Sequence, residues 1–399
     1  MAQTNKRLTS AYWLKPLAVK TPLLNDESIT SWLVRAALNQ GCDPLVLTQF
    51  YWSDYRLWTY DVDKGFHTID DAIHSEMAIL SDTDQTLFDT QNLTYISNQM
   101  GSLAKSQNVS NTWTLPLSKR NTRSRLGYYY CPLCMVDDEK AHLKIHWRMS
   151  WNVYCEQHGV SMLSKCTVCG MPYQPNLIQA QSRFINRCHH CDSRIIDEYC
   201  RNMIIVDEAY SLQELALQHL RTNSANVFDK SIEVHEWFEF ILFLINIARR
   251  TAKTQNPNYM FYRLMQEMGI DIQIQDNSRP ELTDSSTGLA FDYLSNHERI
   301  KFMTYAYLLY EKSLDDWLSV CSNLNITQNS FNWSERTKIP KAFMPVYSNL
   351  PNNSRKKNPS NSNDINPKSL QSVQKAWKRL QRKMEMKDAY EQQRIRSFN

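Results

Sequence analysis

The sequence predicts a mainly α-helical protein with a small zinc-bound β region, and three observations lead to that class. Apolar residues recur with helical periodicity on both sides of a cysteine-rich middle section. That section holds four Cys-x2-Cys or Cys-x2-His pairs, a spacing typical of structural zinc sites. Glycine is scarce, at 8 of 399 residues, which favours helices and polar turns over folds built on Gly-rich phosphate loops.

Composition and charge divide the chain into four parts. We expect a helix-turn-helix N-terminal domain at 1–126, a double zinc-binding region at 127–204, a helical C-terminal domain at 205–350, and an Asn/Ser/Pro linker with a basic amphipathic helix at 351–399. Residues 351–399 hold 12 Lys and Arg against 4 Asp and Glu, a net charge of +8, whereas the whole chain carries +4. The rest of the chain therefore sums to −4 (+4 minus +8), so any attraction to nucleic acid must be local.

The N-terminal part contains a pair of adjacent helices. In residues 25–41, apolar side chains recur at i, i+3, i+4, i+7 and i+8 from Ile29, with Asn25 or Asp26 as the expected N-cap and Gly41 at the end. Asp43 and Pro44 then start a second helix at 44–52. A helix, a tight Gly-containing turn and a helix form the helix-turn-helix pattern. The alternative is an ordinary helical hairpin, which has the same pattern.

Basic residues cluster just before the first cysteine pair. Phosphate contacts are expected from Lys119, Arg120, Arg123 and Arg125, although a solvated loop explains the same charges. After this loop, apolar and polar residues alternate from His142 to Val153, which predicts an extended strand or hairpin that runs into Cys155.

The four pairs supply eight ligands and hence two structural zinc ions per chain. Pairing of neighbours places Cys131, Cys134, Cys155 and His158 at site one, and Cys166, Cys169, Cys188 and Cys191 at site two. A cross-brace pairing of alternate pairs stays open. Spare candidate ligands are His142 and His146 for site one and His189 and His190 for site two. The leftover thiols of Cys42, Cys200 and Cys321 are expected to be small buried side chains.

No catalytic site is expected. A catalytic zinc keeps one coordination position free beside an acid or base, whereas four ligands close each predicted site. The cysteine pairs lack the P-C-x-x-C order of zinc deaminases, and no G-x-x-x-x-G-K-[ST] phosphate loop is present. A zinc-dependent hydrolase or nuclease is therefore the least favoured class, and we expect a protein without enzymatic activity.

The C-terminal half adds a helical domain and a basic tail. The most apolar stretch, 237–248, contains Glu239 and Asn246 and predicts a buried helix rather than a membrane span. Residues 314–327 resemble a second helix-turn-helix weakly. In the tail, apolar residues at heptad spacing from Leu370 to Met384 predict an amphipathic helix, and Lys378, Arg379 and Arg382 are candidate nucleic-acid contacts. A solvated tail is the alternative.

No export signal or membrane segment is expected from the sequence. The first twenty residues lack an apolar stretch of the secretory type, so we expect a cytoplasmic protein. The ten cysteines then favour metal ligation over disulfides.

Four segments in this order resemble the TniQ/TnsD family of transposon target-selection proteins. They are ESITSWLVRAALNQG at 27–41, YYYCPLC at 128–134, HWRMSWNVYCEQHGVSML at 146–163 and CTVCG at 166–170, and the resemblance covers roughly residues 17–195. It implies a helix-turn-helix domain, two zinc sites with the eight ligands named above, and a second helical domain. The basic helix after residue 350 departs from the pattern of the short members of the family.

The resemblance implies two alternative functions. Short members act as adaptors in RNA-guided transposons: as a homodimer they bind the CRISPR Cascade complex with its crRNA, and they recruit the AAA+ regulator TnsC. Such a bacterial protein would be associated with the nucleoid when in complex, reaching target DNA directly or through its partners. Longer, TnsD-like members recognise a chromosomal attachment site directly, and the 44–52 helix would then enter a major groove. The chain length and the negative charge of the body favour the adaptor.

Overall fold

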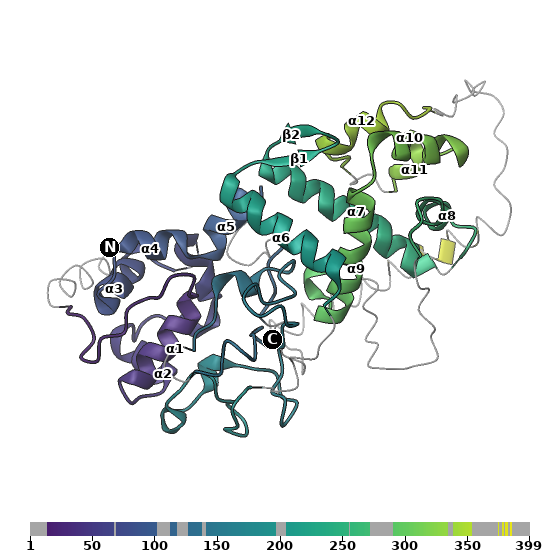
Figure 1. The fold of residues 1–399 in the computed structure, drawn as a ribbon. Coiled ribbons are helices and arrows are strands. Elements are labelled where there is room, and N and C mark those ends of the chain that lie inside the picture. Colours follow the sequence, from purple (N-terminus) through teal and green to yellow (C-terminus); the bar gives the residue numbers. More distant parts are fainter. Residues whose placement is uncertain are drawn as a thin grey trace. The chain divides into compact units, whose positions relative to one another are not determined.

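The computed structural model describes residues 14–67, 69–101, 112–117, 127–137, 141–196, 205–254, 256–271, 290–333 and 338–352, and in the tail residues 374, 377, 378, 380, 381 and 384. The chain separates into two units, Met1–Asn352 and Asn353–Asn399. Both are drawn in Figure 1. The expected boundaries at 126 and 204 lie within the first unit and stay predictions.

The N-terminal part is built from short helices (Figure 1). They are α1 (Ile29–Asn39), α2 (Pro44–Tyr51), η2 (Leu57–Thr59), η3 (Val62–His67), α3 (Asp71–Ser81), α4 (Gln85–Thr90) and α5 (Leu93–Gln99). The predicted helices at 25–41 and 44–52 are thus present, and Gly41 ends the first with a φ of 73°. The structure supports a helical pair here, whereas a DNA-reading helix-turn-helix stays a prediction.

The predicted N-cap of α1 was wrong. Ser28 caps the helix, because its side chain accepts a hydrogen bond from the Ser31 backbone N–H. The carboxylate of Asp26 is occupied elsewhere, in ion pairs with His142 and Lys144, and its backbone has a left-handed φ of 64°. The core beneath α1 is centred on Trp32, which meets Phe88 edge to face at 5.3 Å between ring centroids.

The cysteine-rich part consists of loops joined by isolated bridges. Its regular elements are the 3₁₀ turns η4 (Ile145–Arg148), η5 (Pro175–Leu177) and η6 (Ala180–Ser182). The strand predicted between 142 and 153 is a 3₁₀ turn instead, flanked by bridges at Lys144 and Met149. The alternation fails at Arg148, Ser150 and Asn152, which are polar but buried. Arg148 and Ser150 bind acidic side chains of neighbouring elements.

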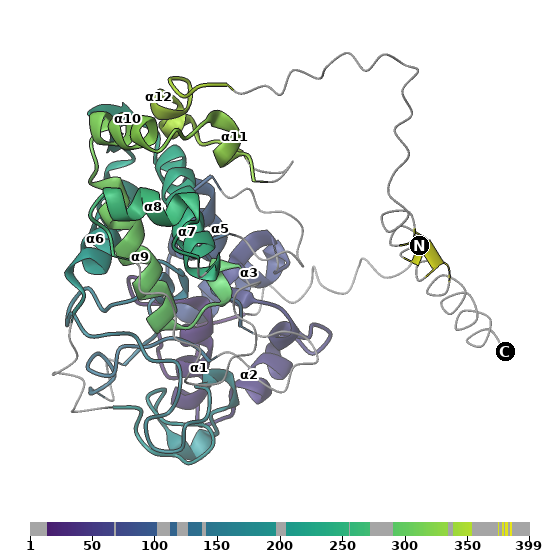
Figure 2. The ribbon, with the colours of Figure 1, turned by 90° about the vertical axis from the view of Figure 1, so that its right-hand side faces the viewer.

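The helical part forms the largest core. Its elements are α6 (Asp207–Thr222), α7 (Val234–Thr254), α8 (Met260–Glu267), η9 (Phe291–Tyr293), α9 (Asn296–Tyr310), α10 (Leu314–Asn323), α11 (Gln328–Phe331), η10 (Lys341–Phe343) and α12 (Met344–Tyr347). The predicted buried helix is α7, which packs against α6 and α9 (Figures 1 and 2). Among the described residues, the only two-stranded sheet joins β1 (Ala225–Val227) to β2 (Lys230–Ile232).

The helical part is bonded to the cysteine-rich part by buried polar side chains. Gln213 of α6 accepts from the backbone N–H groups of Val153 and Tyr154, at 2.8 and 2.9 Å, and donates to the Tyr154 carbonyl. Arg299 of α9 donates to the Ser150 carbonyl at 2.6 Å. These bonds satisfy backbone groups that no sheet or helix pairs.

The second unit contributes few described residues. Positions 374, 377, 378, 380, 381 and 384 are helical and exposed. Trp377, Leu380 and Met384 lie at i, i+3 and i+7 and are 49–61% exposed, as expected for the apolar face of an amphipathic helix. Within the described part of the chain, no helix combines the length and apolar character needed to cross a bilayer.

Candidate metal centres

The cysteine pairs sit on turns with a shared backbone pattern. In three of them the cysteine N–H donates to a carbonyl five residues ahead: Cys155 to Val160, Cys166 to Met171, and Cys188 to Ser193, at 2.8–2.9 Å. In each of these three turns, the backbone N–H of the residue four positions after the cysteine donates to the cysteine carbonyl. These residues are Gly159, Gly170 and Asp192, and each has a left-handed φ. Each turn therefore folds locally and aims its side-chain donors at one point.

Site one gathers Cys131, Cys134, Cys155 and His158. The His158 Nδ1 lies 3.5, 3.3 and 3.6 Å from the sulfurs of Cys131, Cys134 and Cys155, and the Cys134 and Cys155 sulfurs are 3.6 Å apart. Cys131 and Cys155 are buried in the core of this part of the chain. Oxidation to a disulfide is not seen, since all three thiols are free.

Site two gathers Cys166, Cys169, Cys188 and Cys191. The sulfurs of Cys166 and Cys191 are 3.7 Å apart, as are those of Cys169 and Cys188. This site is nearer the surface, because Cys191 is exposed and Cys169 is half-buried. Both sites thus use neighbouring pairs, and the cross-brace pairing is not formed.

The donor geometry fits tetrahedral zinc. With Zn–S near 2.3 Å and Zn–N near 2.05 Å, a regular tetrahedron has S···S edges of about 3.8 Å and S···N edges of about 3.6 Å. The observed edges are 3.6–3.7 Å and 3.3–3.6 Å. Four protein donors fill each tetrahedron, as in structural sites. Two candidate metal sites are therefore present, and zinc as the metal stays a prediction that this donor chemistry favours.

Charge around site one also suits a metal. Contact with Cys131, contact with Cys155 and burial raise the pKa of the Cys134 thiol, so the thiolates need a cation to coexist. A zinc ion with three thiolates and a neutral imidazole would carry a net charge of −1. Burial acts to lower the pKa of Lys144, but Asp26, Cys134 and Cys155 together raise it. Lys144 therefore places a positive charge beside the anionic site.

The spare histidines do not join either group. His142 lies 3.0 Å from Asp26. His146 is packed beside Trp151, and burial lowers its pKa to about 4. Site two is composed of thiols only, without His189 or His190. Of the leftover cysteines, Cys321 is buried and Cys42 half-buried, whereas Cys200 lies outside the described residues.

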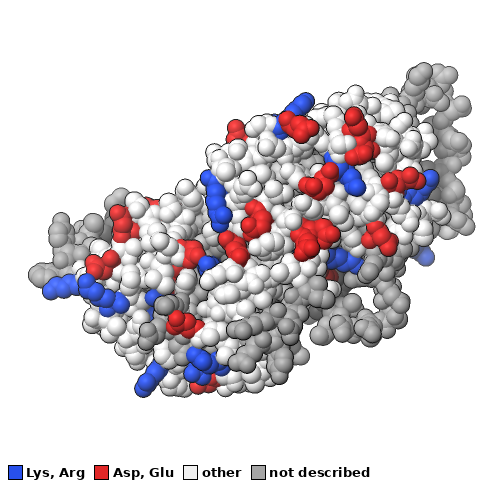
Figure 3. Space-filling view, in the orientation of Figure 1, with Lys and Arg blue, Asp and Glu red and all other residues white. Residues whose placement is uncertain are grey.

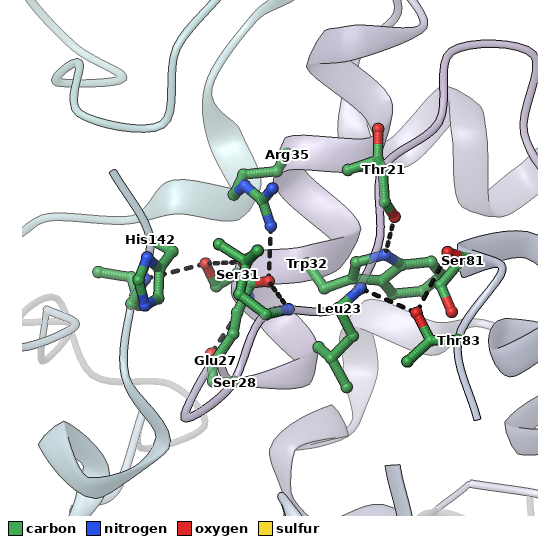
Figure 4. Close-up of polar contacts among 12 residues, drawn as sticks. Thr21, Leu23, Glu27, Ser28, Ser31, Trp32, Arg35, Ser81, Thr83 and His142 are labelled. Atoms are coloured by element: carbon green, nitrogen blue, oxygen red, sulfur yellow. Dashed lines mark hydrogen bonds and ion pairs between the residues drawn. The ribbon is translucent and has the colours of Figure 1, made fainter. Parts of the chain in front are cut away.

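The segment between the two cysteine pairs of site one is bonded to the start of α1. Figure 4 shows the polar contacts at that end of α1. Glu27 is fully buried and accepts from Ser31 Oγ at 2.7 Å and from Arg35 at 2.6 Å. Ser31 Oγ in turn accepts from the Leu143 backbone N–H at 2.9 Å, and the Ser28 N–H donates to the Leu143 carbonyl. The segment between the cysteine pairs is therefore bonded to the first turn of α1.

Arg148 fastens the same segment to η3. Its guanidinium donates to Asp61 at 2.8 and 3.0 Å, to Asp63 at 2.6 Å and to the Leu115 carbonyl at 3.0 Å. Asp63 is fully buried and also accepts from the Thr30 N–H of α1 at 2.8 Å. The cluster joins α1, η3 and the cysteine-rich part in one buried network.

The loop of site two contacts the α1–α2 pair. The turns η5 and η6 lie between its two cysteine pairs and contact α1, and η5 also contacts α2. The N-cap Asp43 of α2 accepts from the Ala180 backbone N–H at 2.7 Å. The loop that a metal at site two would brace is thus the loop that holds α2.

The predicted nucleic-acid contacts are only partly described. Lys119, Arg120, Arg123, Arg125, Arg379 and Arg382 lie outside the described residues, and Lys378 is exposed on the tail helix. Residues 36–55, which include α2, contain Asp43 and Asp54 but neither Lys nor Arg. On the face drawn in Figure 3, positive and negative side chains of the described residues are interspersed, without a large area of one sign.

Sequence reasoning missed the buried charges. Glu27, Asp63 and Arg148 are buried, but nothing in the sequence pattern around them distinguishes them from solvent-exposed charges. The one sequence signal for a buried charge is at Arg148. Its neighbours Trp147, Met149 and Trp151 are large and apolar, and a solvated charge is unusual among such residues.

Comparison with known protein families gives a match over the N-terminal part of the chain. Residues 18–162 match the family model described as TniQ. The matched span includes α1, α2 and all four residues of site one, and ends before site two. Among curated proteins, no relative matches the chain.

Proposed function

The chain is a TniQ family protein, and on that premise we propose that it is a non-enzymatic target-selection adaptor of an RNA-guided transposon. The TniQ domain at 18–162 indicates a protein of transposition target selection and is the observation that carries the proposal. In this proposal the chain binds CRISPR Cascade with its crRNA as a homodimer and recruits the AAA+ regulator TnsC for DNA integration.

The metal centres support a scaffold role. Each would be saturated by four side chains, so no coordination position is left for a substrate or a water nucleophile. Zinc would supply folding free energy here, on the order of 10–16 kcal/mol per site in zinc-finger peptides. Site one and site two would then hold α1 and α2 in a fixed relation for docking.

Direct recognition of an attachment site by a TnsD-like mode is the second candidate. The segment 118–125 and the tail, with its net charge of +8, supply cations for phosphate contacts. Against it stands α2, because residues 36–55 offer no Lys or Arg to a major groove. We therefore place this mode second.

Reconstitution with purified partners separates the two. We expect the full chain to co-elute with a purified Cascade–crRNA complex in size-exclusion chromatography, and to bring the AAA+ regulator with it. By itself the chain should bind duplex DNA weakly, without sequence preference, and with affinity that falls steeply as salt rises. Tight binding to one DNA sequence without Cascade would favour the second candidate. If the chain binds neither Cascade nor a specific DNA site, both candidate functions are contradicted.

A further inference from the structure

Site two is more open to solvent than site one. Its Cys191 is exposed and its Cys169 half-buried, whereas in site one Cys131 and Cys155 are buried and Cys134 is half-buried. An oxidant in solution must reach a sulfur to react with it, so the susceptibility of a thiolate rises with its exposure. Among the seven ligand sulfurs, that of Cys191 is therefore the one that a dissolved oxidant meets first.

The donor set also makes the sulfurs of site two the stronger nucleophiles. With zinc bound, its four thiolates would give a net charge of −2 (+2 minus 4), against −1 for the three thiolates and neutral imidazole of site one. A more anionic site holds the sulfur lone pairs less tightly. Each of its thiolates therefore attacks an electrophile more readily.

Cations beside Cys191 favour the same reaction. Arg187 and Arg194 are partners in a backbone bridge that flanks the turn of this cysteine pair. Arg187 donates to the backbone carbonyl of Asp192, the residue after Cys191, at 3.3 Å. These two guanidinium groups outnumber the one carboxylate of the turn, that of Asp192. A positive charge near the sulfur stabilises the hydroxide that leaves when a peroxide O–O bond breaks.

A second sulfur is placed to form a disulfide with Cys191. The sulfurs of Cys166 and Cys191 are 3.7 Å apart and belong to different turns. The remaining two, of Cys169 and Cys188, are also 3.7 Å apart across the same two turns. A disulfide has an S–S length of about 2.05 Å, so the turns must approach each other by about 1.7 Å from the observed 3.7 Å. Formation of the bond therefore has to shift one turn against the other.

We propose that site two is a thiol redox switch, in which a hydroperoxide oxidises Cys191 and a Cys166–Cys191 disulfide replaces the metal site. The Cys191 thiolate attacks hydrogen peroxide, the O–O bond breaks, and Cys191 becomes a sulfenic acid while hydroxide leaves. The Cys166 thiolate then attacks the Cys191 sulfur and displaces a second hydroxide. In sum, two thiolates, one hydrogen peroxide and two protons give one disulfide and two waters, and the two electrons pass from the thiolates to the peroxide.

The switch would act on α2. A site with two of its four donors lost no longer holds zinc. The loop at 175–182 contacts α1 and α2, and its Ala180 N–H bonds the N-cap Asp43 of α2, so this loop would lose its brace. A dithiol reductant reverses the change by exchange: it becomes a disulfide itself, and the two freed thiolates bind zinc again. The inference rests on the predicted zinc at site two and not on the transposition role, so its failure would leave the adaptor proposal intact.

The test treats the full, zinc-loaded chain with hydrogen peroxide. Zinc release is followed by the absorbance of a chromophoric chelator, disulfides are located by mass spectrometry after free thiols are alkylated, and amide hydrogen exchange reports on α2. Cys191→His replaces the exposed thiolate with an imidazole that also binds zinc. Cys134→His makes the same change at the half-buried thiolate of site one and is the matched control.

We expect the wild-type chain to release its first zinc ion at least about tenfold faster than its second, together with a Cys166–Cys191 disulfide and faster exchange in α2. C191H should slow the first release at least about tenfold, and C134H should leave it within about twofold. Dithiothreitol with added zinc should restore the metal and the slow exchange.

Three results would overturn the proposal. They are oxidation of site one before site two, loss of zinc without the Cys166–Cys191 disulfide, and conversion of Cys191 to a sulfinic acid, which dithiothreitol does not reverse. Equal first-release rates in wild type and C191H would overturn it as well. If either variant lacks zinc before the peroxide is added, the order of oxidation and the disulfide map of the wild type decide.

Discussion

Replacing Arg148 with Met tests whether the buried ion cluster holds the N-terminal helices to the cysteine-rich part. The Arg148 side chain is 3% exposed and lies 2.8 Å from Asp61 and 2.6 Å from Asp63. Met fills much of the same volume without a charge or a donor. The substitution therefore removes the cation while it leaves the packing largely unchanged.

The expected cost follows from what is left behind. Asp63 is fully buried, and burial raises its pKa even though Arg148 opposes the rise. Without the guanidinium, the carboxylate is either an unpaired buried anion or a group that must take up a proton. Loss of one partner of a buried pair costs about 3–5 kcal/mol. In a unit of 352 residues, Met1–Asn352, that corresponds to a fall in Tm of about 4–7 °C.

The assay is thermal unfolding followed by circular dichroism in buffer with excess zinc, with the zinc content of each protein checked. R221M is the matched control, because Arg221 pairs with Glu156 at 3.1 Å with its side chain 69% exposed, and such a pair contributes at most about 1 kcal/mol. The double variant D63N/R148M should recover part of the loss, since it removes the buried anion. If R148M unfolds at the same temperature as R221M, the cluster does not stabilise the fold and the reasoning fails.

Three further predictions concern the metal sites and pH. Elemental analysis should find two zinc ions per chain. The C131S variant should bind one zinc ion, and its 127–163 region should be unfolded. A count of one in the wild type, or a C131S variant that is folded without the metal, would contradict the assignment. C188S should speed amide hydrogen exchange in α1, α2 and 175–182 while α7 stays protected, because η5 and η6 contact the α1–α2 pair. An equal change of exchange in all four segments would show that site two does not support α1 and α2. Burial lowers the pKa of His146 to about 4, below its unfolded value near 6.5, so its stabilising effect is present above pH 6.5 and is lost as pH falls toward 4. Between pH 7.5 and 5.5, the free energy of unfolding of H146Q should therefore fall by roughly 1 kcal/mol less than that of the wild type. Acid release of zinc affects both proteins and cancels in this difference. If the two curves of stability against pH are parallel, His146 is not buried as a neutral imidazole.

The sequence by itself determined the helices and the metal-binding groups. Three of the four cysteine pairs close their own turns through bonds between residues four and five apart, so spacing along the chain is enough to predict the donors. The pairing of neighbouring turns follows because short connections keep them adjacent. The helices α1 and α7 were equally predictable, since their apolar periodicity is a local property of the chain.

Only the tertiary structure decided which charges are buried and which apolar residues stay exposed. Arg148 bonds partners more than eighty residues away, and no local pattern specifies such a contact. The predicted strand is a 3₁₀ turn in the fold, and the polar residues Arg148 and Ser150 are buried there, contrary to the alternation around them. Conversely, Phe50 lies in a predicted helix but is 79% exposed in the fold. Burial is a property of the assembled elements, and it is settled only when segments far apart in the chain meet.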